Sequence, residues 1–398
     1  MHYKIFASNN LITKSLAGDV EVVYTKQMNF DNQTIWLEIN LGAIRRNIQR
    51  IHEHTQRPVM TVVKANAYGH GILEVSRTAI QAGAARLCVA RIEEAIKIRN
   101  AGILAPILVM GYTTPERAVD AIRFGISLMV NLPDLASEYH KVAKQMNGRI
   151  AVHAKIDTGM GRLGVLPNDG CAFGKHIAGL DGLFFEGLFT HFASADEPAK
   201  QTTLEQISKF DQVIAELNTE GIRPQIIHAA NSAASLYFPG AWYDAVRPGI
   251  SIYGLHPSND APLPQEFEPS LTWKCRLSSV KTLPEGSGVG YNHSFVTSKP
   301  ERIGAVAVGY ADGLRRQPDN IVLIGGKRVK QAGGICMDQS MWLLEDNSSA
   351  RAGDEVVLIG KQGEEHITAE EIGALWGTVN YEVVCGLTDR VPRFYIDE

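Results

Sequence analysis

The sequence lacks features that would cross-link the protein or hold it in a membrane. Its five cysteines are an odd number, and none of their spacings indicates a zinc site. We therefore expect free thiols in a reducing cytoplasm and no metal. No apolar run approaches the roughly 18 residues of a membrane span. The first 32 residues also lack the continuous apolar core of a secretory signal.

A strong excess of charge is missing too. The 398 residues carry a net charge of -4, and 45% of them are hydrophobic. This near-neutral balance excludes the basic footprint of a nucleic-acid-binding protein. The length and composition are those of a soluble globular protein with material for two cores. Residues 1–33 are polar and irregular, and we expect a loosely attached extension there.

Between Trp36 and about Pro257, short apolar runs alternate with amphipathic stretches that predict helices, such as those at 92–100, 132–145 and 203–219. Eight runs predict strands, at residues 59–63, 87–90, 107–110, 127–130, 150–156, 184–190, 226–228 and 243–246. Eight strand–helix alternations favour a (β/α)8 barrel of the TIM type, although a doubly wound open sheet would show the same alternation. Polar residues at the ends of several strands favour the barrel, because barrel enzymes work at that rim.

The first of these strands ends at Lys64, and Gly69 and Gly71 then precede a helix predicted from about Ile72. Burial of a lysine is unfavourable unless the amine has a function there. It lowers the pKa of the amine, and a neutral amine can form a Schiff base. Taken alone, Lys64 could equally be a side chain that extends into solvent.

Other polar residues follow the later strands. They are Lys155, Asp157 and Arg162 after the fifth strand, His191 after the sixth, Asn231 and Ser232 after the seventh, and Arg247 and Gly249 after the eighth. The last two loops of such barrels often bind phosphate. A hydroxyl-capped helix start at residues 231–233 and a tight turn at 246–251 would both suit an anion. The Lys155–Arg162 cluster could also be a plain salt-bridge network, and His191 a structural histidine.

Four prolines between His256 and Ser270 indicate a linker. Beyond it, short strands separated by turn signals predict an all-β domain. One helix is expected at 369–375, where Thr368 and Glu371 form a capping box. The glycines at 286, 288 and 290 precede no helix, so they predict a hairpin and not a nucleotide site. The expected domains are the extension 1–33, a barrel at 34–266 and a β domain at 267–398.

Taken together, nine motifs in this order resemble the alanine racemase family, whose members use pyridoxal 5'-phosphate (PLP) on a barrel followed by a β domain. The matching segments are 63–71, 155–164, 190–192, 231–234, 246–254, 289–291, 309–316, 336–339 and 380–382. Each motif is modestly specific, but the ordered set spans nearly the whole chain beyond the extension. The resemblance therefore implies a fold, a cofactor and a role for each matching residue.

By this resemblance, Lys64 holds PLP as a Schiff base and then acts as one catalytic base. Tyr291 is the second base and comes from the partner subunit of a homodimer. Arg247 hydrogen-bonds the pyridine nitrogen, and His191 links Arg247 to Tyr291. The remaining implied contacts are Tyr68, Asn231, Ser232, Gly249, Ile250 and Tyr381 to the cofactor, and Arg162, Met337 and Asp338 to the substrate. Lys155 occupies a position at which family members often carry a carbamylated lysine.

The chemistry agrees with this resemblance. Racemisation removes a proton from one face of Cα and returns one to the other, so two bases on opposite faces suit it. We expect interconversion of L- and D-alanine, which supplies peptidoglycan if the source is a bacterium. A serine or broad-specificity racemase of the same fold is the alternative. A non-catalytic PLP carrier is disfavoured, because such single-domain barrels lack the domain that carries Tyr291 and Met337.

Overall fold

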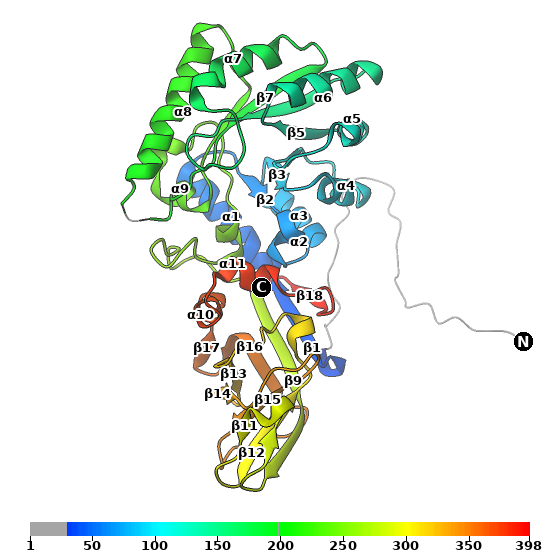
Figure 1. The fold of residues 1–398 in the computed structure, drawn as a ribbon, viewed down its shortest axis with the longest axis vertical. Coiled ribbons are helices and arrows are strands. Elements are labelled where there is room, and N and C mark those ends of the chain that lie inside the picture. The colour runs from blue at the N-terminus through cyan, green and yellow to red at the C-terminus, as the bar shows by residue number, and fades with distance from the viewer. Residues whose placement is uncertain (1–29, 198) are drawn as a thin grey trace, which may run out of the picture. The chain divides into compact units, whose positions relative to one another are not determined.

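The computed structural model describes residues 30–197 and 199–398. Residues 33–398 form one compact unit, in which the barrel and the β domain lie at opposite ends (Figure 1). Residues 1–29, nearly all of the expected extension, lie outside the described residues, so that prediction is not tested. The five cysteines are free thiols.

Seven parallel strands pair in sequence order to form the barrel sheet. They are β2 (Met60–Val62), β3 (Arg86–Val89), β4 (Ile107–Val109), β5 (Ile126–Val130), β6 (Ile150–Lys155), β7 (Leu183–Phe189) and β8 (Ile226–His228). The eighth expected strand forms only two bridges, from Ala245 to His228 and from Val246 to Val59. These bridges join the last strand to the first, so the sheet closes. The predicted barrel is confirmed over the open sheet.

Amphipathic helices follow the barrel strands. They are α3 (Ile72–Gln81), α4 (Ile92–Asn100), α5 (Ala118–Phe124), α6 (Pro133–Gln145), α7 (Pro167–Ala178), α8 (Gln201–Thr219) and α9 (Ser232–Tyr237). In α8, for example, Phe210, Val213 and Leu217 are buried, because residues three and four apart share one helix face. The helices predicted at 92–100, 132–145 and 203–219 are confirmed to within two residues. No helix among the described residues is long and apolar enough to cross a membrane.

A nine-stranded, mostly antiparallel sheet forms the β domain, in the order β17-β16-β13-β14-β15-β12-β9-β1-β18. Its strands are β1 (Ile35–Asn40), β9 (Leu271–Leu283), β12 (Glu301–Val306), β13 (Ile321–Ile324), β14 (Lys327–Gln331), β15 (Ser340–Leu344), β16 (Glu355–Gln362), β17 (Glu365–Ile367) and β18 (Arg393–Ile396). The glycines at 286–290 lead into the expected hairpin, β10 (Gly288–Val289) with β11 (Phe295–Val296). Thr368 caps helix α10 (Ala369–Leu375) as predicted, but the Glu371 carboxylate accepts from Arg328 and does not complete the expected capping box.

Strand β1 belongs to the β domain although it precedes the barrel in sequence. It pairs antiparallel with β9 and parallel with β18. The expected barrel limits of 34–266 had included it, because an apolar strand pattern does not reveal the partner strand. The β domain therefore contains a segment from each end of the described chain. The other expected domain limits remain predictions.

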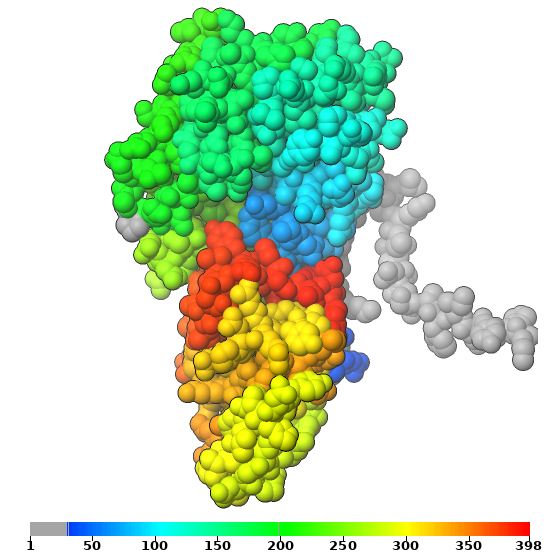
Figure 2. Space-filling view, viewed as in Figure 1, coloured from blue at the N-terminus to red at the C-terminus, as the bar shows by residue number. Residues whose placement is uncertain are grey.

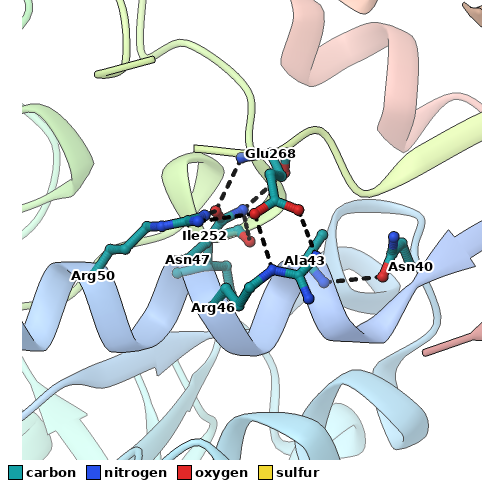
Figure 3. A network of polar contacts seen from close by, with 7 residues as sticks. All are labelled: Asn40, Ala43, Arg46, Asn47, Arg50, Ile252 and Glu268. Atoms are coloured by element: carbon teal, nitrogen blue, oxygen red, sulfur yellow. Dashed lines mark hydrogen bonds and ion pairs between the residues drawn. The ribbon is translucent and has the colours of Figure 1, made fainter. Parts of the chain in front are cut away.

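Helix α1 (Leu41–Thr55) fixes the linker between the barrel and the β domain (Figure 3). The Glu268 carboxylate accepts hydrogen bonds from Arg46 and Arg50, each at 2.9 Å. Asn47 donates to the backbone carbonyls of Ile252 and Glu268, at 3.1 and 2.9 Å. Hydrogen bonds from Arg46 in particular lower the pKa of Glu268 to about 2, so the carboxylate stays ionised. The chain therefore enters the β domain from an anchored point.

The C-terminal segment returns to the barrel. Helix α11 (Asn380–Cys385) contacts α2 (Lys64–Tyr68), the turn that follows β2. Arg393 in β18 donates to the Gly69 carbonyl at 2.8 Å. Figure 2 shows these C-terminal residues, in red, packed against the blue part of the barrel. Residues distant in sequence thus meet at the C-terminal ends of the barrel strands.

Candidate active site

A cavity of about 630 Å³ lies at the C-terminal ends of the barrel strands, with α11 in its wall. Every predicted cofactor-binding residue lines it, together with Arg162 from the substrate set and Lys155, the expected carbamylation position. Those lining residues are Lys64, Tyr68, Lys155, Arg162, His191, Asn231, Ser232, Arg247, Gly249, Ile250 and Tyr381. The barrel and α11 thus bring together residues that are separated by more than 300 positions in the sequence.

Lys64 stands at the start of a strained turn. Residues 65–68 all have positive φ, between 52 and 54°. A non-glycine residue in this left-handed conformation costs roughly 1–2 kcal/mol, so the surrounding fold must hold the turn in place. Glu94 contributes by accepting a hydrogen bond from the Ala65 N–H at 2.6 Å. The turn places both Lys64 and Tyr68 on the cavity.

The Lys64 amine loses its proton more easily than an ordinary lysine does. Burial lowers its pKa, and the positive charge of Arg162 lowers it further. The amine lies 6.0 Å from the centre of the Tyr68 ring. Tyr68 is itself buried, which raises the pKa of its phenol, so the hydroxyl stays protonated and can donate a hydrogen bond. The cavity therefore holds a potential nucleophile beside a fixed donor.

The loops after the last strands interlock. The Asn231 side chain caps α9 by accepting from the Ala234 N–H at 3.0 Å. The hydroxyl cap expected at this helix is therefore wrong, because the Ser232 hydroxyl accepts instead from the Gly249 and Ser251 N–H groups, at 2.9 and 3.3 Å. A Cβ atom on Gly249 would lie 2.4 Å from the Tyr68 hydroxyl. Glycine alone allows the backbone and that hydroxyl to approach so closely.

Arg247 is a buried cation, with 4% of its surface exposed. It donates to His228 Nδ1 at 2.6 Å and to the carbonyls of Thr190 and Ala229 at 2.8 and 3.0 Å. Among the described residues, no carboxylate forms an ion pair with it. Burial lowers its pKa to about 10, so the guanidinium is protonated at neutral pH.

His191 lines the same cavity, but within the described part of the chain the histidine hydrogen-bonded to Arg247 is His228. Burial, followed by the charge of Arg247, holds the pKa of His191 well below its usual range. His191 is therefore neutral. Its expected link between Arg247 and Tyr291 remains a prediction.

The Lys155–Arg162 cluster is not a salt-bridge network among its own side chains. Asp157 accepts instead from the backbone N–H groups of residues 159–162, at 2.9–3.0 Å. It thereby shapes the loop that holds Arg162 on the cavity. Lys155 is 5% exposed, and burial, followed by Arg247, lowers its pKa well below the usual value.

Three predicted residues do not line the cavity. Tyr291 is 70% exposed and Met337 53% exposed, both on the β domain. Asp338 forms an ion pair with Arg390 at 2.7 Å. A single chain therefore leaves its predicted second base on the surface, apart from the Lys64 cavity.

A buried polar network behind Arg247 was not predicted from the sequence. His228 Nε2 lies 2.8 Å from His153 Nδ1, and His153 Nε2 lies 2.9 Å from the Glu186 carboxylate. That carboxylate also accepts from Arg86 and Ser127, at 2.6 and 2.5 Å. The available signal was the placement of polar residues in the middle of apolar strands. No group of three or more His, Cys, Asp or Glu residues among those described could hold a metal ion.

Comparison with known proteins gives a consistent result. Residues 39–257 match the family model "Alanine racemase, N-terminal domain", and residues 270–395 match "Alanine racemase, C-terminal domain". An alanine racemase of Symbiobacterium thermophilum is 43% identical, over 90% of this chain and 96% of its own. A crystal structure of alanine racemase from Bacillus anthracis with bound L-Ala-P superposes with a TM-score of 0.88 at 38% identity, covering 92% of this chain and 96% of that one. A histidine racemase from Leuconostoc mesenteroides superposes with a TM-score of 0.84 at 27% identity, covering 92% and 99%.

Proposed function

Because the chain belongs to the alanine racemase family, and is therefore an amino-acid isomerase, we propose that it interconverts L- and D-alanine with PLP as cofactor. One observation carries the proposal. One cavity is lined by Lys64 with its lowered pKa, by Tyr68 and Tyr381, and by the buried Arg247, whose guanidinium has no carboxylate partner in the described part of the chain.

The donor groups of this cavity fit PLP. The Lys64 amine suits the aldehyde carbon of the cofactor, and Arg247 suits the ring nitrogen. The phosphate would be held by the hydroxyls of Tyr68, Ser232 and Tyr381, together with Asn231 and the backbone at Gly249 and Ile250. This group of donors lies around the Gly249 turn, where a side chain larger than glycine would collide with Tyr68.

When bound, PLP withdraws electrons from Cα of the amino acid and makes the α-proton removable. Lys64 would hold the cofactor and then, as a free amine, exchange that proton on one face of Cα. The partner subunit's Tyr291 would act on the opposite face. Arg162 would hold the substrate carboxylate, aided by Met337 and Asp338.

Arg247 would control which reaction follows. A guanidinium donates a hydrogen bond but does not give up its proton at neutral pH, so it would leave the ring nitrogen unprotonated. A weaker electron sink should disfavour transamination. His191, beside Arg247 and neutral, would carry the connection to the partner's Tyr291.

We further propose a homodimer whose two sites are each shared between subunits. The exposure of Tyr291 and Met337 on the β domain supports this arrangement. We place the enzyme in the cytoplasm, with D-alanine for peptidoglycan as its product if the source is a bacterium. No nucleic acid or membrane partner is part of the proposal.

Lys155 is proposed to carry a carbamate that pairs with Arg162. The neutral amine is the form that adds to CO₂, and burial with Arg247 favours that form. A ¹³C NMR signal from protein equilibrated with ¹³C-bicarbonate would report the carbamate, and the Lys155→Ala variant is the control. A wild-type spectrum identical to that of the variant would reject the modification.

Substrate preference is tested by circular dichroism on L-alanine, L-serine and L-histidine. Tyr381 lines the cavity and crowds it toward a methyl side chain, so we expect the highest kcat/KM on alanine. A histidine racemase of the same fold makes this comparison necessary. A preference for serine would favour the alternative of a serine or broad-specificity racemase. Absorbance before and after borohydride reduction tests the cofactor on its own.

A further inference from the structure

A continuous line of hydrogen bonds leads from Arg247 away from the cavity and through the barrel. It passes through His228 in β8 and His153 in β6 to Glu186 in β7, where Arg86 holds the carboxylate with two bonds of 2.6 and 3.0 Å. His228 and His153 are fully buried, and the Glu186 side chain is 14% exposed. The proposed reaction uses only Arg247 from this line.

The direction of every bond in this line follows from its first member. Arginine has no acceptor, so Arg247 must donate and His228 Nδ1 must accept. The only proton of His228 then sits on Nε2 and is donated to His153 Nδ1. By the same reasoning His153 carries its proton on Nε2 and donates it to Glu186. If either imidazole carried a second proton, two N–H donors would face each other and one hydrogen bond of the line would be lost.

The charges agree with this direction. Burial lowers the pKa of His153 to about 4 and that of His228 well below its usual range, so both rings are neutral. Burial raises the pKa of Glu186, but hydrogen bonds from His153 and Arg86 outweigh burial and lower it, so the carboxylate is ionised. Two neutral imidazoles thus connect a buried cation to a buried anion.

Two features of the backbone serve this line and have no other evident use. The pairing of β6 with β7 shifts register between Val152 and His153, which leaves Glu186 as the extra residue of a bulge. Bulges re-aim side chains beside functional sites. The next residue, Gly187, faces the ring of His153, and a Cβ atom there would lie 2.1 Å from Nδ1. The fold leaves space for this imidazole specifically.

We propose that Glu186, His153 and His228 are positioning residues that fix Arg247 as a hydrogen-bond donor toward the cavity. We call this line of hydrogen bonds the relay. It holds one imidazole lone pair on the guanidinium, and Glu186, whose charge is balanced by Arg86, fixes its far end by accepting the proton of His153. Because a guanidinium has only N–H donors, the relay fixes the orientation in which Arg247 presents them to the cavity. This inference rests on the proposed function, because it gives the relay control over the PLP ring nitrogen.

The first test uses the protein without cofactor. In ¹⁵N-histidine NMR, assigned with single His→Gln variants, we expect His153 and His228 to be neutral with the proton on Nε2, and to stay so at pH 6. A proton on Nδ1 of His228, or a charged ring at pH 6, would overturn the relay. This measurement does not depend on catalysis or on PLP.

The second test uses the holoenzyme with Glu186→Gln and Gly187→Ala. The first removes the anion, and the second displaces the His153 ring without removing a polar group. The matched control is Thr61→Val in the same barrel, which removes a buried hydroxyl that has no hydrogen-bond partner among the described residues. We expect kcat to fall about tenfold to a hundredfold in both variants, the usual loss when a residue that orients a functional group is changed. The control should keep the kcat of the wild type.

A purely structural role would lower stability without changing the cofactor. We therefore expect both variants also to convert bound PLP to its amine form faster per turnover, as seen by loss of its absorbance. An unchanged ratio of transamination to racemisation in folded variants would overturn the proposal. If the wild type bound no PLP, the proposed function would fail instead. Should both variants fail to fold, the tautomers of the wild type still decide the question.

Discussion

The residues of the predicted site are mostly buried on the barrel rim but mostly exposed on the surface of the β domain. On the rim, Lys155 and Arg247 are buried and their pKa values are shifted. On the β domain, Tyr291 and Met337 are exposed. Buried polar groups must find partners within the fold, whereas exposed ones need none. The comparison teaches that folding preorganises one half of the predicted site and leaves the other half on the surface, as the proposed shared site of a dimer requires.

Removing the central group of the barrel half should have the largest effect. We expect Lys64→Ala to lower kcat/KM by at least about 1,000-fold, because both the covalent anchor and one base are lost. The borohydride-trapped cofactor should disappear as well. Lys97→Ala, an exposed lysine on α4, is the control and should keep full activity. Activity of Lys64→Ala within tenfold of wild type would contradict the assignment.

The β-domain half can be broken without disturbing the barrel. Tyr291→Phe should lower kcat by about 100- to 10,000-fold, the usual range for losing an acid–base group, while PLP remains bound. If sites are shared, co-expression of this variant with Lys64→Ala should restore about a quarter of wild-type activity. Random pairing makes about half of the dimers mixed, and one of the two sites in each mixed dimer is intact.

The control for that mixture pairs Lys64→Ala with the double variant Lys64→Ala/Tyr291→Phe. No combination of these chains contains an intact site, so no activity should return. No recovery in the first mixture despite proven heterodimers would argue that each chain completes its own site. Recovery in the control would instead contradict the role of Lys64.

Acid should weaken the barrel before the β domain. His153 has a pKa of about 4 when folded but near 6.5 in the unfolded chain, and the pKa of His228 is also lowered. Between these values only the unfolded chain binds the protons, so stability falls as the pH drops from 6.5 toward 4. Hydrogen exchange, corrected for intrinsic rates, should show β6 and β8 losing protection before β12 and β15. Equal loss in both regions would contradict this.

The smallest effect concerns the strained turn after Lys64. Ala65→Gly should raise the free energy of unfolding by up to about 1 kcal/mol, because glycine tolerates positive φ. Ala172→Gly, at an exposed position inside α7, should lower it by about 1 kcal/mol. Chemical denaturation of the two variants provides the comparison. Destabilisation of both by the same amount would show that the turn carries no relievable strain.

Sequence patterns predicted the elements better than their partners. The apolar runs and amphipathic stretches located the barrel strands and helices closely, since periodicity reflects which face is buried. They did not show that β1 pairs with β9 and β18, because pairing depends on residues more than 200 positions away. The motifs also located Asn231 and Ser232, but which side chain caps α9 depended on the position of the Gly249 turn.

The sequence alone determined the order of the barrel strands, the residues at their ends and the family of the chain. These features depend on local periodicity and on motifs that are contiguous in the chain. The relay from Arg247 to Glu186, the left-handed turn after Lys64 and the separation of Tyr291 from the cavity were decided by the tertiary structure. These features depend on burial and on contacts between distant segments, which change the protonation and the reach of side chains whose identity remains the same.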